Sequence, residues 1–140
     1  SGAGLEALAA AAEQEIEDVD AAVRGLDSAG AMLQRIGEPS RAAEVHALAL
    51  ERAGNAGMDS HRIGPLVNHA ILLTRLGDDA RASEHAAEAL VLMDVTGHRQ
   101  SESRLRHLLG SLALRRGDAA GAAGEFARGL HADQPQVAQG

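Results

Sequence analysis

Apolar residues recur every three or four positions along most of this chain, which is the spacing of one face of an α-helix. Two such stripes follow each other in the middle of the sequence: Leu66, Ala70, Leu73 and Leu76, then Ala82, Ala86, Ala89 and Leu92 or Met93. Gly77 and Asp78 separate them. Glycine can end a helix in the left-handed conformation, and an acidic residue suits the positive start of the next helix. The pattern therefore predicts two amphipathic helices joined at a Gly-acidic corner.

The same corner occurs three times, because Gly37, Gly77 and Gly117 are spaced forty residues apart and each precedes an acidic residue. A small residue lies seven positions before each glycine, where two helices would approach closely. Alanine lies five positions after each glycine, and leucine lies thirteen after. The aligned columns are Gly30, Ala70 and Gly110; Leu33, Leu73 and Ala113; Ala42, Ala82 and Ala122; and Leu50, Leu90 and Leu130. Such self-similarity at a fixed period is the signature of a helical repeat protein.

The periodicity predicts an all-α chain of about seven antiparallel helices. Six of them are expected at 20–36, 39–54, 60–76, 79–96, 100–116 and 119–132. Asp59 with Ser60, and the segment 18–20, are predicted N-terminal caps. Three repeats then cover 20–134, as units 20–57, 58–97 and 98–134, and residues 135–140 are expected to be a disordered tail.

The first 19 residues allow two interpretations. Residues 5–10 align with 45–50 when the register is moved back by forty, so 1–19 could be an acidic orphan helix, the second half of a truncated repeat. A single helix over 5–36 is the alternative, since no Gly or Pro separates residues 5 and 24. We favour two helices, because Glu17, Asp18 and Asp20 would crowd one continuous helix. The start at Ser1 and Gly2, without methionine, leads us to expect a fragment of a longer bacterial protein.

Composition narrows the function classes. Thirty alanines and eighteen leucines favour helix, whereas one Phe and no Trp or Tyr disfavour base-stacking nucleic-acid modules. Cysteine is absent, so disulfides and thiolate sites are excluded. The net charge is −7, and residues 1–27 carry −6 of it, which argues against direct binding to nucleic acid. Without an apolar run long enough to span a membrane, we expect no membrane partner and a cytoplasmic location.

The repeat columns resemble the tetratricopeptide repeat, whose pattern is W-x2-L-G-x2-Y, then A-x3-F, then P. The third copy is most similar, with Leu109-Gly110, Ala113, Ala122, Phe126, and Pro135 one residue late. The period of forty exceeds the standard unit of about 34 residues, and is similar to the extended repeats of kinesin light chains and large bacterial helix-turn-helix transcription activators. HEAT and armadillo repeats have comparable periods, but the Gly-acidic corners favour the tetratricopeptide family. The resemblance implies a right-handed α-α superhelix.

That resemblance also places the first helix of each repeat on a concave face, where partners bind. Arg35, Arg75 and Arg115 form a column there, two residues before each corner glycine. Neighbouring outward positions hold Arg24, Gln34, Asn68, Thr74, Arg104 and His107. Guanidinium groups at repeat spacing could each bind a carboxylate of an acidic protein or peptide. The alternative is structural, because an arginine in the last turn of a helix can also pair with a corner acid such as Asp78 or Asp118.

The seven histidines do not indicate a metal site, since no two share the i, i+4 spacing of a helical zinc site. His46 and His69 fall in core-side columns and are expected to be packed and neutral. Phosphate loops and nucleophile elbows are lacking, so we expect no enzyme, no metal and no cofactor.

Together these observations predict a non-catalytic scaffold that binds proteins or peptides on its concave face. The alternative is the sensory or oligomerising part of a bacterial transcription regulator whose DNA-binding domain lies outside this sequence. An alanine-rich face at Ala9 to Ala12 also suggests a homodimer through the amino-terminal helix.

Overall fold

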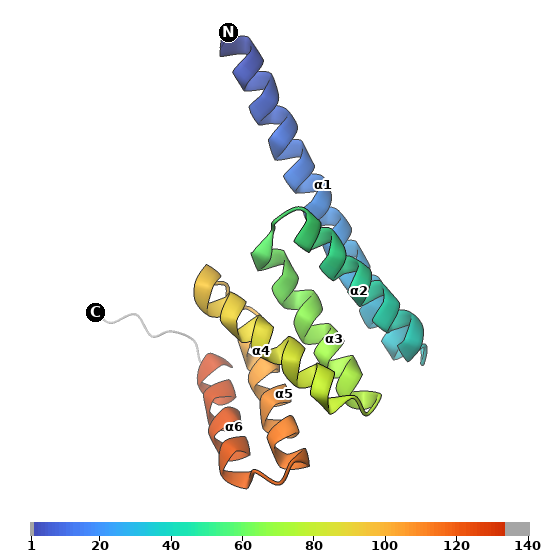
Figure 1. Cartoon of the computed structure of the whole chain (residues 1–140), viewed down its shortest axis with the longest axis vertical. Coiled ribbons are helices and arrows are strands. Elements are labelled where there is room, and N and C mark those ends of the chain that lie inside the picture. The colour runs from blue at the N-terminus through green and yellow to red at the C-terminus, as the bar shows by residue number, and fades with distance from the viewer. Residues whose placement is uncertain (1, 134–140) are drawn as a thin grey trace, which may run out of the picture.

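The computed structural model describes residues 2–133, and this part of the chain is helical without strands. It contains six α-helices and one short 3-10 helix, so the all-α class is as predicted (Figure 1). In chain order the elements are α1 (Gly2–Arg35), α2 (Pro39–Asn55), η1 (Asp59–Arg62), α3 (Ile63–Arg75), α4 (Asp79–Thr96), α5 (Glu102–Arg115) and α6 (Ala119–Asp133). The predicted tail and Pro135 lie outside the described residues.

Consecutive helices pair as antiparallel hairpins, α1 with α2, α3 with α4 and α5 with α6, and the hairpins stack side by side (Figure 1). The main hydrophobic core lies among α3, α4 and α5, where Leu66, Met93 and Leu105 are fully buried. A smaller cluster joins Val23 of α1 to Ala49 and Ala53 of α2. The array is therefore held together by contacts between neighbouring helices. Among the described helices, none is both long and apolar enough to cross a membrane.

The predicted corners are present, and one backbone geometry builds all three. Gly37, Gly77 and Gly117 have φ values of 84°, 86° and 83°, in the left-handed region that favours glycine. The amide of the following acidic residue donates to the carbonyl five residues earlier, for example Asp78 N to Leu73 O at 2.8 Å. This is the Schellman motif, which satisfies carbonyls that the helix end leaves free. The side chain of Asp78 also caps α4, since its Oδ1 accepts from the amide of Arg81 at 3.2 Å.

The small-residue column lies where the two helices of a hairpin approach closely, as the sequence predicted. A Cβ added to Gly110 would lie 2.5 Å from Cε1 of Phe126, and one added to Gly30 would lie 2.5 Å from Cε1 of His46. Each ring comes from the second helix of the same hairpin and covers the glycine directly. In the middle hairpin the equivalent positions are Ala70 and Ala86, and both are fully buried.

The preference for two helices within residues 1–36 is wrong, because α1 is continuous from Gly2 to Arg35. The segment 18–20, expected to cap a helix, lies inside it. Partners relieve the crowding of acids there: Gln14 donates to Asp18 at 2.9 Å, and Asp20 pairs with Arg24 and lies 2.6 Å from Nε2 of His61. The hydrogen bond from Arg24, assisted by His61, holds the pKa of Asp20 below its usual range. One long helix thus replaces two of the seven that we expected.

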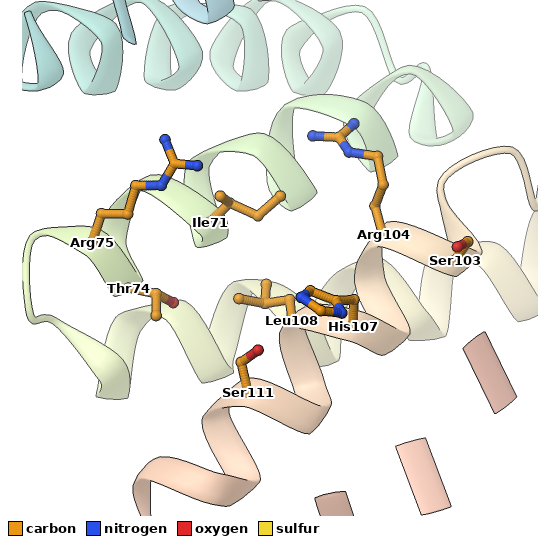
Figure 2. A pocket seen from close by; sticks show the side chains of 8 residues that line it. All are labelled: Ile71, Thr74, Arg75, Ser103, Arg104, His107, Leu108 and Ser111. Atoms are coloured by element: carbon orange, nitrogen blue, oxygen red, sulfur yellow. The ribbon is translucent and has the colours of Figure 1, made fainter. Parts of the chain in front are cut away.

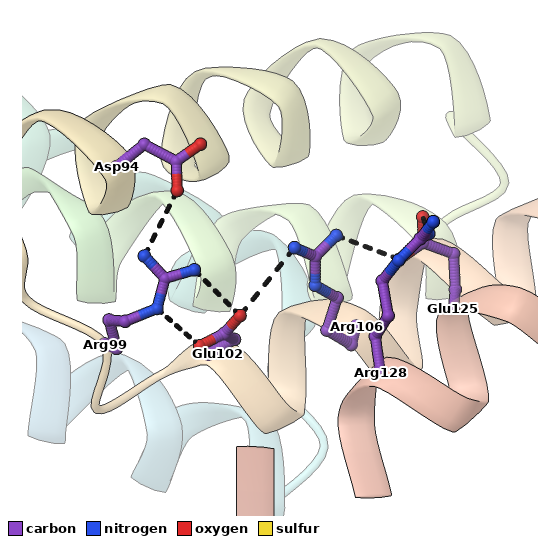
Figure 3. Close-up of polar contacts among 6 residues, drawn as sticks. All are labelled: Asp94, Arg99, Glu102, Arg106, Glu125 and Arg128. Carbon is purple, nitrogen blue, oxygen red and sulfur yellow. Dashed lines mark hydrogen bonds and ion pairs between the residues drawn. The ribbon is translucent and has the colours of Figure 1, made fainter. Parts of the chain in front are cut away.

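A chain of charged side chains links the last three helices (Figure 3). Arg99, in the loop before α5, donates to Asp94 of α4 at 3.1 Å and to Glu102 of α5 at 2.7 Å. The hydrogen bond from Arg99 lowers the pKa of Glu102. Arg106 then joins α5 to α6 by lying 3.1 Å from Glu125. The contact of Arg99 with Asp94 thus connects the third hairpin to the second, and that of Arg106 with Glu125 holds the two helices of the third hairpin together.

Candidate functional site

The first helices of the three hairpins line a shallow groove, which we call the concave groove. One part of it, about 490 Å³ in volume, lies between α3 and α5 (Figure 2). Its lining residues are Ile71, Thr74, Arg75, Ser103, Arg104, His107, Leu108 and Ser111. An adjoining part of about 510 Å³ lies between α1 and α3, lined by Ala31, Gln34, Arg35, Ile71, Arg75 and Arg104. The two parts share Ile71, Arg75 and Arg104, so they form one continuous surface.

Three arginines face this groove without an acidic partner among residues 2–133, namely Arg35, Arg75 and Arg104. Figure 2 shows the guanidinium groups of Arg75 and Arg104 on either side of Ile71. A guanidinium group presents its donors in a planar fork that fits a carboxylate. The groove therefore combines an apolar strip with positive charge that the described chain leaves uncompensated.

Arg115, which the sequence places in the same column, has a different environment. Its Nε donates to Oδ2 of Asp79 at 2.6 Å, which joins α5 to the start of α4. This hydrogen bond raises the pKa of Arg115. The structure thus puts Arg104, from the opposite end of α5, beside Arg75. Arg115 makes a structural contact, as in the alternative interpretation, but its partner is Asp79 of the neighbouring hairpin and not Asp78 or Asp118. The forty-residue interval alone does not reveal which arginine of α5 faces the groove and which one pairs with a neighbouring hairpin.

Asn68 lies at the edge of the groove, in a polar chain that crosses three helices. Its Nδ2 donates to both carboxylate oxygens of Asp27 at 2.8 Å, and its Oδ1 accepts from Arg104. On the far side of Asp27, Nδ1 of buried His46 lies 3.0 Å from Oδ1, although the ring makes no hydrogen bond to it. Asn68 thus fixes Arg104 with a neutral partner, which leaves the positive charge of that guanidinium available.

Arg24 is remote from the groove. It pairs with Asp20 and borders a separate hollow of about 290 Å³ between α1, η1, the start of α3 and the loop before α5. Of the nine predicted site residues, six line the groove: Gln34, Arg35, Thr74, Arg75, Arg104 and His107. Asn68 is outside the lining and contacts it through Arg104. The prediction omitted the apolar floor, Ile71 and Leu108. Both were identifiable from helical spacing, since residue 71 precedes Arg75 by four and residue 108 follows Arg104 by four.

The expected burial of His46 and His69 is confirmed. The ring of His69 lies against that of His85, with centroids 4.9 Å apart and the ring planes tilted by 51°. Burial, helped by the proximity of His85, lowers the pKa of His69 to about 4, so this imidazole is neutral at pH 7. Within residues 2–133, no group of three or more His, Asp or Glu side chains is arranged to hold a metal ion. These histidines belong to the packing of the hairpins.

Comparisons with known proteins agree with this architecture. No protein-family model matches the sequence. A TPR repeat-containing protein of Pseudomonas aeruginosa is 40% identical over 103 residues, which are 74% of this chain and 36% of that protein. The chain thus spans about a third of the length of this relative. The crystal structure of the TPR domain of Arabidopsis FLU matches with a TM-score of 0.71 at 16% identity, over 86% of this chain and 95% of that chain. The predicted fold, a right-handed superhelix of paired helices, is thereby confirmed.

Proposed function

We propose that this chain, which sequence similarity and fold together assign to the tetratricopeptide-repeat family, is a scaffold that binds an acidic peptide segment in its concave groove. Proteins of this family are in general non-catalytic interaction scaffolds. The observation that carries the proposal is the set of three groove arginines, Arg35, Arg75 and Arg104, that have no acidic partner among residues 2–133. Most arginines outside the groove, such as Arg62, Arg99 and Arg115, are paired with carboxylates. Arg41 and Arg52 of α2 are exposed and unpaired among residues 2–133, but they do not line the groove.

The lining suggests which peptide fits. Ile71 and Leu108 offer an apolar floor, and the guanidinium groups stand at its borders. In an extended segment that alternates acidic and apolar side chains, the two kinds point in opposite directions. The apolar side chains could then face the floor, while the long arginine side chains at its borders could bind the carboxylates on the other side. Thr74, His107 and Ser111 could bond its backbone. Three hairpins about 10 Å apart accommodate roughly six to ten extended residues.

The charge distribution favours the same class of ligand. The chain carries −7 overall, but −6 of that belongs to residues 1–27. The described groove residues include three arginines and no Asp or Glu. Attraction of an acidic segment to this exposed surface should weaken as salt concentration rises.

The experiment is fluorescence anisotropy with two labelled eight-residue peptides, one alternating Glu with Leu and one alternating Lys with Leu. We expect only the acidic peptide to bind, with a micromolar dissociation constant. Arg75→Glu should weaken binding at least tenfold without a change in the melting temperature. The matched control is Arg41→Glu, which makes the same charge reversal on α2, away from the groove. Lost stability with unchanged binding would contradict the proposal and assign Arg75 a structural role.

The cytoplasmic location and the alternative role in a transcription regulator stay predictions from the sequence.

A further inference from the structure

A second surface of the molecule, independent of the concave groove, lies on the amino-terminal half of α1. This half projects beyond α2 (Figure 1), and every residue from 2 to 18 is exposed. Large apolar side chains are among them: Leu5 is 70% exposed, Leu8 68% and Ile16 54%. At 1.5 Å per residue this exposed segment is about 25 Å long, enough for a partner helix of several turns.

The exposed apolar residues continue, toward the amino terminus, the apolar stripe of α1 that packs against α2. Along α1 the stripe runs through Leu5, Ala9, Ala12, Ile16, Val19, Val23 and Leu26, with alternating steps of four and three residues. That is the spacing of a helix-pairing seam. Its carboxyl-terminal part, Val19 to Leu26, packs against Ala49 and Ala53 of α2. Since α2 ends at Asn55, the same face is uncovered toward the amino terminus.

The borders of the uncovered part are acidic. Viewed along the helix at 100° per residue, Glu6, Glu13 and Glu17 lie on one side of the stripe and Glu15 lies on the other. Within residues 2–133 none of these four carboxylates forms an ion pair. The first basic residue of the chain is Arg24.

The acidic borders indicate which kind of partner can bind the uncovered stripe. The homodimer that the alanine-rich face suggests would pair two copies of α1 through this stripe and bring glutamates against glutamates, which is destabilising at helix-pairing borders. Anionic lipid would be repelled in the same way. A helix with Lys or Arg at the bordering positions would instead form ion pairs along both sides of the seam.

From this continuity and charge we infer that residues 5–16 of α1 form a docking site for a partner's amphipathic helix whose apolar stripe is bordered by Lys and Arg. The partner helix lies antiparallel to α1, in line with α2, and extends the α1–α2 interface. The concave groove meets α1 near Ala31, Gln34 and Arg35, at the other end of the helix, so both surfaces can be occupied together.

The test uses two synthetic 21-residue peptides with Leu at the seam positions, one with Lys and Arg at the bordering positions and one with Glu there. Binding of each labelled peptide to the full chain is measured by fluorescence anisotropy at low and high salt. We expect the basic peptide to bind at least tenfold more tightly than the acidic one, and to weaken as salt increases.

Variants locate the site. Leu5→Gln combined with Ile16→Gln should reduce binding of the basic peptide at least tenfold. The matched control, Ala7→Gln combined with Ala11→Gln, places the same side chains on the opposite face of the same segment and should not change binding. All four positions are exposed, so circular dichroism should give the same melting temperature for both variants. Glu6→Lys combined with Glu13→Lys should shift the preference toward the acidic peptide.

Several outcomes would overturn the inference: equal affinity for the two peptides, no binding of either, or equal losses from the seam and control variants. Sedimentation of the unliganded chain as a dimer that the Leu5 and Ile16 substitutions dissociate would assign the stripe to a second copy instead. Arg75→Glu, which tests the concave groove, should leave binding of the basic helix unchanged. Failure of one proposal is therefore distinguishable from failure of the other.

Discussion

The ring of Phe126 lies against the backbone at Gly110, so closely that a methyl group at residue 110 would be 2.5 Å from Cε1 of that ring. His46 covers Gly30 in the same way. In each pair the ring follows the glycine by 16 residues, and Ala86 follows Ala70 by the same interval. Two hairpins therefore combine a glycine with a ring, and the middle hairpin combines two alanines.

Gly110→Ala should destabilise the fold, because the added methyl group must displace a packed ring. The free energy of unfolding in urea should fall by about 1 to 3 kcal/mol, as for other over-packed sites. Gly25→Ala is the control, since α1 is helical there and nothing lies within 4 Å of the added Cβ. That substitution should raise stability by about 0.5 to 1 kcal/mol.

A double-mutant cycle tests whether the ring is the cause. Phe126→Ala removes the group that the new methyl would strike, so its combination with Gly110→Ala should cost less than the two single substitutions added together. Additive costs would show that the glycine is required for some other reason.

Gly77→Ala should also destabilise the fold, but because of backbone strain and not because of a steric clash. Gly77 has a φ of 86° with open space around its α-carbon, so the cost is conformational strain of about 1 to 2 kcal/mol. Gly124→Ala, at a helical position with no heavy atom closer than 4.0 Å, should not show this cost. Equal effects of the two substitutions in urea denaturation would argue against strain at the corner.

His69 should make stability depend on pH in the mildly acidic range. Burial lowers its pKa to about 4 in the folded chain, against about 6.5 when unfolded. Below pH 6.5 the unfolded state gains a proton that the folded state does not. The contribution of His69 to the free energy of unfolding is therefore fully present above pH 6.5 and declines as pH falls toward 4. The slope contributed is at most about 1.4 kcal/mol per pH unit.

The measurement is urea denaturation of the unmodified chain and of His69→Leu between pH 7.5 and 4.5. The variant should lose less stability than the unmodified chain as pH falls from 6.5 to 5. Parallel curves for the two proteins would show that His69 does not titrate differently in the folded and unfolded states.

Two arginines that pair with the carboxylate of Glu125 should contribute differently to the free energy of unfolding. Arg106 is 13% exposed and lies 3.1 Å from Glu125, whereas Arg128 is an exposed side chain 2.9 Å from the same residue (Figure 3). Arg106→Ala should cost about 1 to 3 kcal/mol, because it removes packing and leaves Glu125 less well paired. Arg128→Ala should cost less than about 1 kcal/mol. Similar melting temperatures for the two variants would contradict this ranking.

The groove was only partly predictable. Helical spacing placed Gln34, Arg35, Thr74 and Arg75 on outward faces of the first helices, and these side chains do line the groove. The sequence did not reveal that Arg115 would pair with Asp79, because the two residues come from different hairpins. For the same reason, the contact of Arg104 with Asn68 could not be inferred from local spacing.

What the sequence determined by itself is local. Glycine in the left-handed corners, alanine columns at fixed spacing and the close approach at Gly30 and Gly110 all depend on residues within one hairpin. The tertiary structure decided the rest. In α1 it added His61 of η1 as a partner of Asp20, next to the local pair of Asp20 with Arg24, in the acidic segment that we expected to oppose a continuous helix. It also left Arg75 unpaired while pairing Arg115, because charge partners are chosen by distances between helices that no repeat period specifies.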